Sequence, residues 1–247
     1  MCFKKVLVKR VFVTILSCVV LILALPNIAL AFSFQMSPIE FKSLSRECQS
    51  AYAASDLGKR LGYNRIAPPL DPSLKYVVAR SGAWHYCGAL IRLRRAELSV
   101  VADQRDLLFE QSISGIDYTY SRIDQSHPWA SEMAVNLARA YRGLGKKKKA
   151  FSYLEQAIKI VPESIDARKM YAYLYMDDKK HQEALKYLNE AFELSKQSSG
   201  EVAYLIGLNS YRSGNIPNAK KYSDIALNLG YPLRWLSSQL SKKSEHK

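Results

Sequence analysis

The stretch GKKKKAFSYLEQAIKIVP, residues 145–162, contains the pattern that decides the fold. Ala150, Leu154 and Ala157 are spaced i, i+4 and i+7, so a helix would place them on one face. Gly145 predicts a turn before that helix, and Pro162 predicts its end. The stretch therefore predicts a helix that buries small residues and one leucine against a neighbouring element.

The same pattern recurs further along the chain. Equivalent residues lie 34 positions apart in five pairs: Ala138 and Ala172, Tyr141 and Tyr175, Ala150 and Ala184, Leu154 and Leu188, Ala157 and Ala191. A third copy places Ala219 and Ala226 35 positions after Ala184 and Ala191. The extra residue falls in the polar stretch 196–200, where a loop can accommodate it. Self-similarity at a fixed period of this length predicts a helical repeat architecture.

This pattern resembles the tetratricopeptide repeat (TPR) family, whose 34-residue unit is a pair of antiparallel helices, A and B. The units would cover residues 131–164, 165–198 and 200–233. Small residues where helices A and B cross would let them approach closely, and larger residues beside them would fill the gap. The third unit is weaker, because Ser210 and Ser223 stand where large residues are expected; Tyr211 and Tyr222 could fill that space.

The resemblance implies an all-α fold, an α-solenoid of three TPR-like hairpins with a C-terminal capping helix. One hairpin cannot bury its apolar face alone, so the units must stack and the last one needs a cover. We expect the capping helix to begin at Pro232, with Trp235, Leu236 and Leu240 covering the open end. The predicted domains are a signal peptide (1–31), a divergent helical region (32–125) and the TPR domain with its cap (126–247).

The first 31 residues have the pattern of a signal peptide. A basic start is followed by an apolar run from Val11 to Leu25 and by Ala29-Leu30-Ala31, a typical cleavage site. Cleavage after Ala31 would make the protein periplasmic or secreted; an uncleaved segment anchored in the inner membrane is the alternative. Removing 31 of 247 residues leaves 216, and removing four of 36 basic residues leaves 32 against 22 acidic ones, a net charge of +10.

The region before the repeats is less regular. Ser37 to Glu40 has a helix-start pattern, and that helix could run to about Gly58 or Gly62. Asp71-Pro72 could start the next helix. Trp84, Cys87, Gly88 and Ile91 have the spacing of TPR helix A, but the following segment, about 100–120, lacks the helix B pattern. We therefore expect a divergent hairpin here.

Two cysteines, Cys48 and Cys87, remain after the predicted signal peptide. Two cysteines in an exported chain most simply form one disulfide, which would join the divergent hairpin to the first helix. The alternative is a redox or nucleophilic thiol. Neither cysteine belongs to a C-x-x-C pair, so the disulfide is the favoured interpretation.

Sequence signatures of enzymes are absent from the chain. There is no G-x-S-x-G, P-loop, dinucleotide fingerprint or H-E-x-x-H motif, and His85, His127, His181 and His246 lack metal-ligand spacing. We expect a non-catalytic protein without a metal or cofactor. The net positive charge of an exported protein favours acidic proteins, anionic lipid or polyanionic glycan as partners, and not nucleic acid.

In a TPR protein, the helix A residues outside the core line the concave face. By register we expect a groove that binds a peptide or helical segment of a partner protein with some acidic character. The predicted groove residues are Val135, Asn136, Arg139, Arg142, Lys169, Tyr173, Met176, Tyr204, Leu208 and Tyr211. Tyrosine and arginine are enriched at interface hot spots. Asp166 and Met170 stand where carboxylate-binding TPR proteins carry cations, so binding of C-terminal carboxylates is not predicted.

The leading functional prediction is a periplasmic adaptor or scaffold in an envelope process such as export or surface-polymer assembly. The alternatives are a binder of anionic glycan or lipid, and an inner-membrane-tethered scaffold. The lysine run at 146–149 is either a solvated turn or a contact for an anionic partner. The sequence predicts neither the partner, the pathway nor the oligomeric state.

Overall fold

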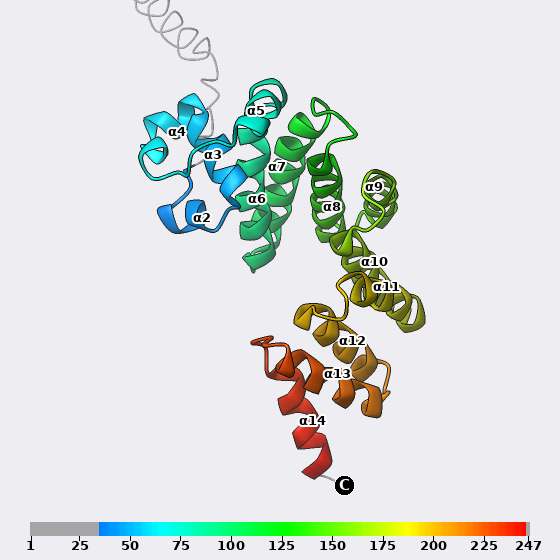
Figure 1. The fold of residues 1–247 in the computed structure, drawn as a ribbon. Helices are drawn as coiled ribbons and strands as arrows, with labels where there is room; N and C mark the ends of the chain where they lie inside the picture. Colours follow the sequence, from blue (N-terminus) through cyan, green and yellow to red (C-terminus); the bar gives the residue numbers. More distant parts are fainter. Residues whose placement is uncertain (1–34, 246–247) are drawn as a thin grey trace, which may run out of the picture. The chain divides into compact units, whose positions relative to one another are not determined.

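Helices form all the regular secondary structure between residues 35 and 245, the part of the chain that this computed structural model describes (Figure 1). The residues from Pro38 onward belong to one compact unit. The predicted signal peptide lies outside the described residues. Among residues 35–245, none of the helices combines the length and the apolar character needed to span a membrane.

The segment after Ser37 forms three short helices, α2 (Pro38–Lys42), α3 (Arg46–Ala54) and α4 (Asp56–Arg60). The prediction of one helix to about Gly58 or Gly62 was therefore wrong. Two serines explain the breaks: the Ser45 hydroxyl accepts a hydrogen bond from the Cys48 backbone N–H, and Ser55 does the same for Gly58. A serine that caps a new helix start competes with continuation of the preceding helix.

Two 3₁₀ turns, η1 (Tyr63–Arg65) and η2 (Pro72–Leu74), lead to α5 (Lys75–Ser81). Asp71 caps the second turn, as its Asp-Pro sequence predicted. Helices α6 (Ala83–Leu98) and α7 (Ala102–Tyr120) then pack together as the expected divergent hairpin. A disulfide joins Cys48 on α3 to Cys87 on α6, as predicted.

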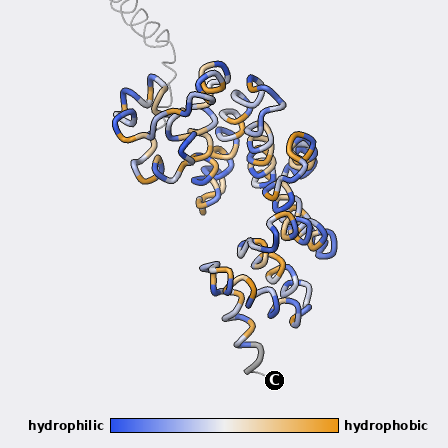
Figure 2. Tube along the Cα trace, in the orientation of Figure 1, coloured by the Kyte–Doolittle hydropathy of each residue, from blue (hydrophilic) through white to orange (hydrophobic). Residues whose placement is uncertain are grey.

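The three predicted repeats form three helical hairpins, which confirms the all-α solenoid. They are α8 (Pro128–Gly143) with α9 (Lys147–Ile160), α10 (Ile165–Asp177) with α11 (His181–Leu194), and α12 (Gly200–Arg212) with α13 (Ile216–Asn228). The two helices of each pair pack against each other, and α10 also contacts α8 and α9. Figure 2 shows hydrophilic and hydrophobic residues alternating within these helices, as expected where one side of each is buried.

The small residues of the repeat lie where the helices of a hairpin meet. All are buried, with at most 1% of their surface exposed: Ala138, Ala150, Ala157, Ala172, Ala184, Ala191, Ala219 and Ala226. Gly207 occupies the helix A position of the third hairpin, and a Cβ there would lie 2.9 Å from Leu236 Cδ2 and 3.2 Å from the Ala219 carbonyl oxygen. Close helix packing thus accounts for the residue types that recur with the period.

The third hairpin replaces two large residues by polar ones. Ser210 is fully buried and accepts a hydrogen bond of 2.7 Å from the Asn218 side chain. Tyr211 and Tyr222 pack against the core of this region, as expected. Lys196 and Gln197, which lie in the linker with the extra residue, have left-handed backbone conformations (φ 53° and 58°).

The capping helix is α14 (Trp235–Glu245), which packs on α12 and α13. It begins at Trp235 and not at Pro232, and Tyr231, just before this segment, packs on Tyr204 of α12. Leu236 is fully buried, whereas Trp235 stays 50% exposed. The leucine therefore covers the end of the stack, and the tryptophan covers it only in part.

The turns between helices A and B need a left-handed residue. Gly145 (φ 69°) and Gly214 (φ 84°) fill this position in the first and third hairpins, and Lys179 (φ 57°) fills it in the second. A residue with a Cβ is disfavoured in this conformation by about 1–2 kcal/mol relative to its helical form. The lysine therefore makes the second turn less stable than a glycine would.

We expect Lys179→Gly to raise the free energy of unfolding by about 0.5–1 kcal/mol. Relief of the left-handed strain of about 1–2 kcal/mol outweighs the greater freedom of glycine in the unfolded chain. Urea unfolding would measure this. Lys148→Gly, in the helical backbone of α9, is the control and should destabilise the protein by about 1 kcal/mol. If Lys179→Gly also destabilises, the strain argument is wrong.

Loss of the disulfide should lower the free energy of unfolding by about 4 kcal/mol in the chain-entropy model, because the bridge closes a loop with a sequence separation of 39 residues. The measurement is denaturant unfolding of the Cys48→Ala, Cys87→Ala double variant. A reductant should lower the free energy of unfolding of the wild type by a similar amount and leave that of the double variant unchanged. A reductant effect on the double variant would show that another group is responsible.

Candidate functional site

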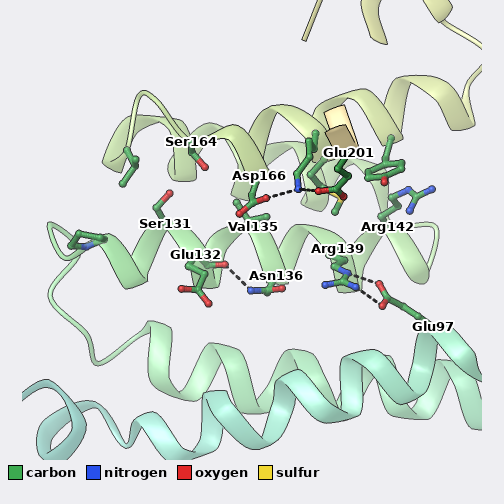
Figure 3. Close-up of a pocket in the computed structure, with 15 residues that line it drawn as sticks. Glu97, Ser131, Glu132, Val135, Asn136, Arg139, Arg142, Ser164, Asp166 and Glu201 are labelled. Carbon is green, nitrogen blue, oxygen red and sulfur yellow. Dashed lines mark hydrogen bonds and ion pairs between the residues drawn. The ribbon is translucent and has the colours of Figure 1, made fainter. Parts of the chain in front are cut away.

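Successive A helices share a pocket of about 710 Å³, here called the A-helix pocket (Figure 3). Its walls come mainly from α8 and α10, with one residue each from α6 and α12. The lining residues are Glu97, Pro128, Ser131, Glu132, Val135, Asn136, Arg139, Arg142, Val161, Ser164, Asp166, Lys169, Met170, Tyr173 and Glu201. The pocket thus lies along the helix A face that the repeat register indicated.

All three cations of the pocket form ion pairs with carboxylates of the chain itself. Two of them are arginines of α8 that bind in a bidentate manner, Arg139 to Glu97 of α6 and Arg142 to Asp177 of α10. Figure 3 shows the two contacts between Arg139 and Glu97. Each pair therefore links the A helices of neighbouring hairpins.

Lys169 of α10 provides the third link. Its ammonium group lies 2.8 Å from Asp166 on the same helix and 2.8 Å from Glu201 on α12. Burial alone would lower the pKa of Lys169, but its bonds to the two carboxylates outweigh this effect and raise the pKa above the ordinary value. Lys169 therefore stays charged and keeps α10 and α12 connected.

These contacts position the hairpins more than they stabilise them. Partly exposed ion pairs contribute about 0.2–1 kcal/mol each, because solvent screens them and ordering two long side chains costs entropy. Their planar two-point geometry, however, fixes distance and orientation between helices. Arg142 also lies over the Tyr173 ring, 5.0 Å from its centroid. Both residues are therefore held by the protein as well as exposed to the pocket.

One acidic residue of the pocket, Glu132 on α8, has a different environment. Its Oε1 accepts a hydrogen bond of 2.5 Å from the hydroxyl of Tyr86, a fully buried residue of α6. The same hydroxyl accepts a bond of 3.0 Å from the Asn136 side chain, which also donates to the Glu132 backbone carbonyl. Within residues 35–242, no cation lies within 4.0 Å of the Glu132 carboxylate.

Glu132 as a whole residue is exposed to solvent, but nearby protein atoms partly desolvate its carboxyl group. This partial burial raises the pKa of Glu132; the Tyr86 hydrogen bond opposes the rise, and the charges of Asp166 and Glu47 add to it. Burial, followed by the Glu132 charge, raises the pKa of Tyr86 well above its usual value, so the hydroxyl keeps its proton. Tyr86 is thus a neutral donor to the Glu132 carboxyl group.

The structure brings together some of the predicted groove residues and separates others. Val135, Asn136, Arg139, Arg142, Lys169 and Tyr173 line the A-helix pocket. Met176, Tyr204, Leu208 and Tyr211 do not. Met176 and Tyr204 are buried, with 5% and 8% of their surface exposed, and Leu208 packs partly buried against the same core.

The C-terminal segment explains why the third hairpin adds no wall residues beyond Glu201. Tyr204 packs against Tyr231, with ring centroids 5.0 Å apart, and Tyr211 packs edge-on against Trp235 at 6.0 Å. The chain itself thus covers much of this part of helix A. Repeat register cannot show this, because Tyr231 and Trp235 lie after the two helices of the last hairpin.

Sequence reasoning missed Tyr86 and the acidic residues of the pocket as site residues. Glu132 lies one helical turn before Asn136, so extending the register by four residues would have found it. Tyr86 gave no such signal, since it lies in the divergent hairpin, 46 residues before Glu132. The acids Glu97 and Glu201 likewise became recognisable only once the A helices were placed side by side.

The remaining candidate residues have local roles. His85 stacks between Trp84 and Tyr118, with centroid distances of 3.7 and 4.1 Å, and burial lowers its pKa. In the lysine run, Lys147 pairs with Asp178, and Lys149 lies over the Tyr141 ring. Among the side chains of residues 35–242, no group of three or more His, Cys, Asp or Glu is placed to hold a metal ion.

Comparison with known proteins gives one family match. A family model described as anaphase-promoting complex, cyclosome, subunit 3 matches residues 117–191. This range includes α8, α9 and α10 and most of α11, which form the first two predicted repeats. A search of curated proteins finds no match.

Solved structures show distant similarity. PilF of Pseudomonas aeruginosa is 18% identical with a TM-score of 0.49, and the match covers 81% of this chain and 85% of PilF. MamA of Desulfovibrio magneticus RS-1 is 16% identical with a TM-score of 0.46, covering 63% of this chain and 87% of MamA. BtubC of P. vanneervenii is 18% identical with a TM-score of 0.47, covering 77% and 72%.

We expect Glu132→Gln to stabilise the protein at neutral pH. A carboxyl whose pKa is raised by folding destabilises the folded state while it is ionised, and this cost vanishes below its ordinary pKa of about 4.3. The gain should therefore be present at pH 7 and disappear near pH 4. Urea unfolding at both pH values would measure it.

Glu163→Gln removes an exposed carboxylate outside the pocket and is the matched control. It should change the free energy of unfolding little at either pH. A Glu132→Gln variant that is less stable than the wild type at pH 7 would contradict this description of the site.

Proposed function

We propose that the chain is a non-catalytic adaptor, which binds a segment of a partner protein in the A-helix pocket. The proposal starts from the premise that the chain belongs to the tetratricopeptide class of helical repeat proteins. Repeats of this class generally serve as scaffolds for protein–protein interaction, because stacked hairpins present one continuous face. The single observation that carries the proposal is the pocket itself, about 710 Å³ in volume and shared by successive A helices.

The composition of the pocket supports binding and not catalysis. Its walls combine apolar groups such as Val135 and Met170 with ordered polar groups, the pattern of a site that recognises a side chain and its backbone. Its three cations are paired, and its one carboxylate without a cation is hydrogen-bonded to a tyrosine. This arrangement lacks the pair of a nucleophile and an adjacent base that covalent catalysis needs.

We further propose that the adaptor works in the cell envelope, in export or surface-polymer assembly. The signal-peptide pattern of residues 1–31 supports this location, and the disulfide between Cys48 and Cys87 is compatible with an oxidising compartment. N-terminal sequencing of the protein from cells would test the location. A mature start at Phe32 is expected, and a chain that retains Met1 to Ala31 would favour the membrane-tethered alternative.

Site-specific photo-cross-linking tests the binding site. A photoreactive phenylalanine analogue at Val161, which lines the pocket, should capture a partner in intact cells, whereas the same analogue at exposed Lys148 on α9 should not. The captured protein is then purified and must give the same adduct in vitro. Capture at position 148 alone would instead assign binding to the lysine turn.

Simple truncation of pocket residues is a poorer test. Arg142→Ala removes the contact to Asp177 as well as a pocket side chain, so loss of binding and loosening of two hairpins would be confounded. The cross-linker at Val161 leaves all the ion pairs in place.

A further inference from the structure

We infer that the A-helix pocket selects a partner segment through a basic side chain, lysine or arginine, which pairs with Glu132. This inference rests on the proposed function and specifies its ligand. It reverses the expectation of an acidic segment, which was based on the number of cations along helix A.

The first step is that the pocket has no cation to offer an acidic ligand. Arg139, Arg142 and Lys169 each lie within 4.0 Å of a carboxylate of this chain. An acidic partner residue would have to displace one of these carboxylates. The displaced carboxylate would stay beside the same cation, so little would be gained by the exchange.

The second step is that Glu132 is ready to accept a cation. The Tyr86 hydroxyl donates to Oε1, and Asn136 holds that hydroxyl in place, so the orientation of the carboxylate is set before a ligand arrives. Among the described residues, no hydrogen bond to Oε2 is found. Preorganisation of this kind reduces the entropy that binding costs.

The third step is charge complementarity. The pocket lining contains four acidic residues, Glu97, Glu132, Asp166 and Glu201, against three basic ones, which gives a formal charge of −1. The whole chain, in contrast, carries +14. Asp166 and Glu47 both act on Glu132 as like charges. A cation beside Glu132 would relieve this repulsion, whereas an anion would add to it.

The fourth step concerns the shape of the ligand. Val135 and Met170, which line the same pocket, are 7% and 6% exposed, so each adds a small apolar surface to its wall. Lysine and arginine combine an aliphatic stem with a charged end, and they bury the stem along such surfaces. A basic side chain therefore matches both features of the wall.

The test uses a random nine-residue peptide library, displayed on phage and selected on the full-length chain. Selected peptides are synthesised, and those that cross-link to the photoreactive analogue at Val161 are identified as pocket binders. We expect these peptides to share a lysine or arginine. Their affinity should fall about tenfold or more for Glu132→Gln and change little for Glu163→Gln.

A second measurement does not depend on the variant. Replacing the shared basic residue by norleucine keeps the aliphatic stem and removes the charge, so affinity for the wild-type chain should also fall about tenfold. Isothermal titration calorimetry would measure the affinities of the parent peptide and of the norleucine peptide.

The outcomes separate the two proposals. Pocket binders that lack a basic residue, or that bind Glu132→Gln as tightly as the wild type, would overturn the inference and leave the adaptor function standing. If no peptide cross-links at Val161, the pocket is not the binding site, and the proposed function fails together with the inference.

Discussion

The structure depends on the close approach of two helices within each hairpin. Alanine or glycine at the crossing positions lets helices A and B pack closely, and the crossing alanines have almost no exposed surface. A single hairpin cannot bury its outer apolar side. Stacking therefore follows from the packing of one unit. It also explains why the third hairpin needs Leu236 of α14, which closes the space over Gly207.

Stacking in turn brings the A helices side by side, and their charged residues then meet in pairs. Glu97, Asp177 and Glu201 lie on three different helices, and each holds a cation of a neighbouring helix. The same cations that suggest an acidic ligand in the sequence are thus structural links in the fold. What remains accessible in the pocket is an ordered carboxylate, which changes the expected chemistry of the partner.

Much of the fold was predictable from local pattern. The i, i+4, i+7 spacing of Ala150, Leu154 and Ala157 and its recurrence after 34 residues gave the helices, the turns and the solenoid class. Predictions failed where side-chain hydrogen bonds or tertiary contacts override the pattern. Ser45 and Ser55 divided a predicted helix, and the contacts of Tyr231 and Trp235 cover part of the predicted groove.

For the candidate site, the resemblance to TPR proteins indicated helix A as the lining helix, and the 3.6-residue periodicity indicated which of its residues lie outside the core. Only the tertiary structure decided which of those residues are available. Pairing and burial depend on residues distant in the chain, such as Tyr86 beside Glu132 and Trp235 beside Tyr211. Local periodicity has no information about such contacts, since they arise only when the hairpins stack and the C-terminal segment folds back on the last one.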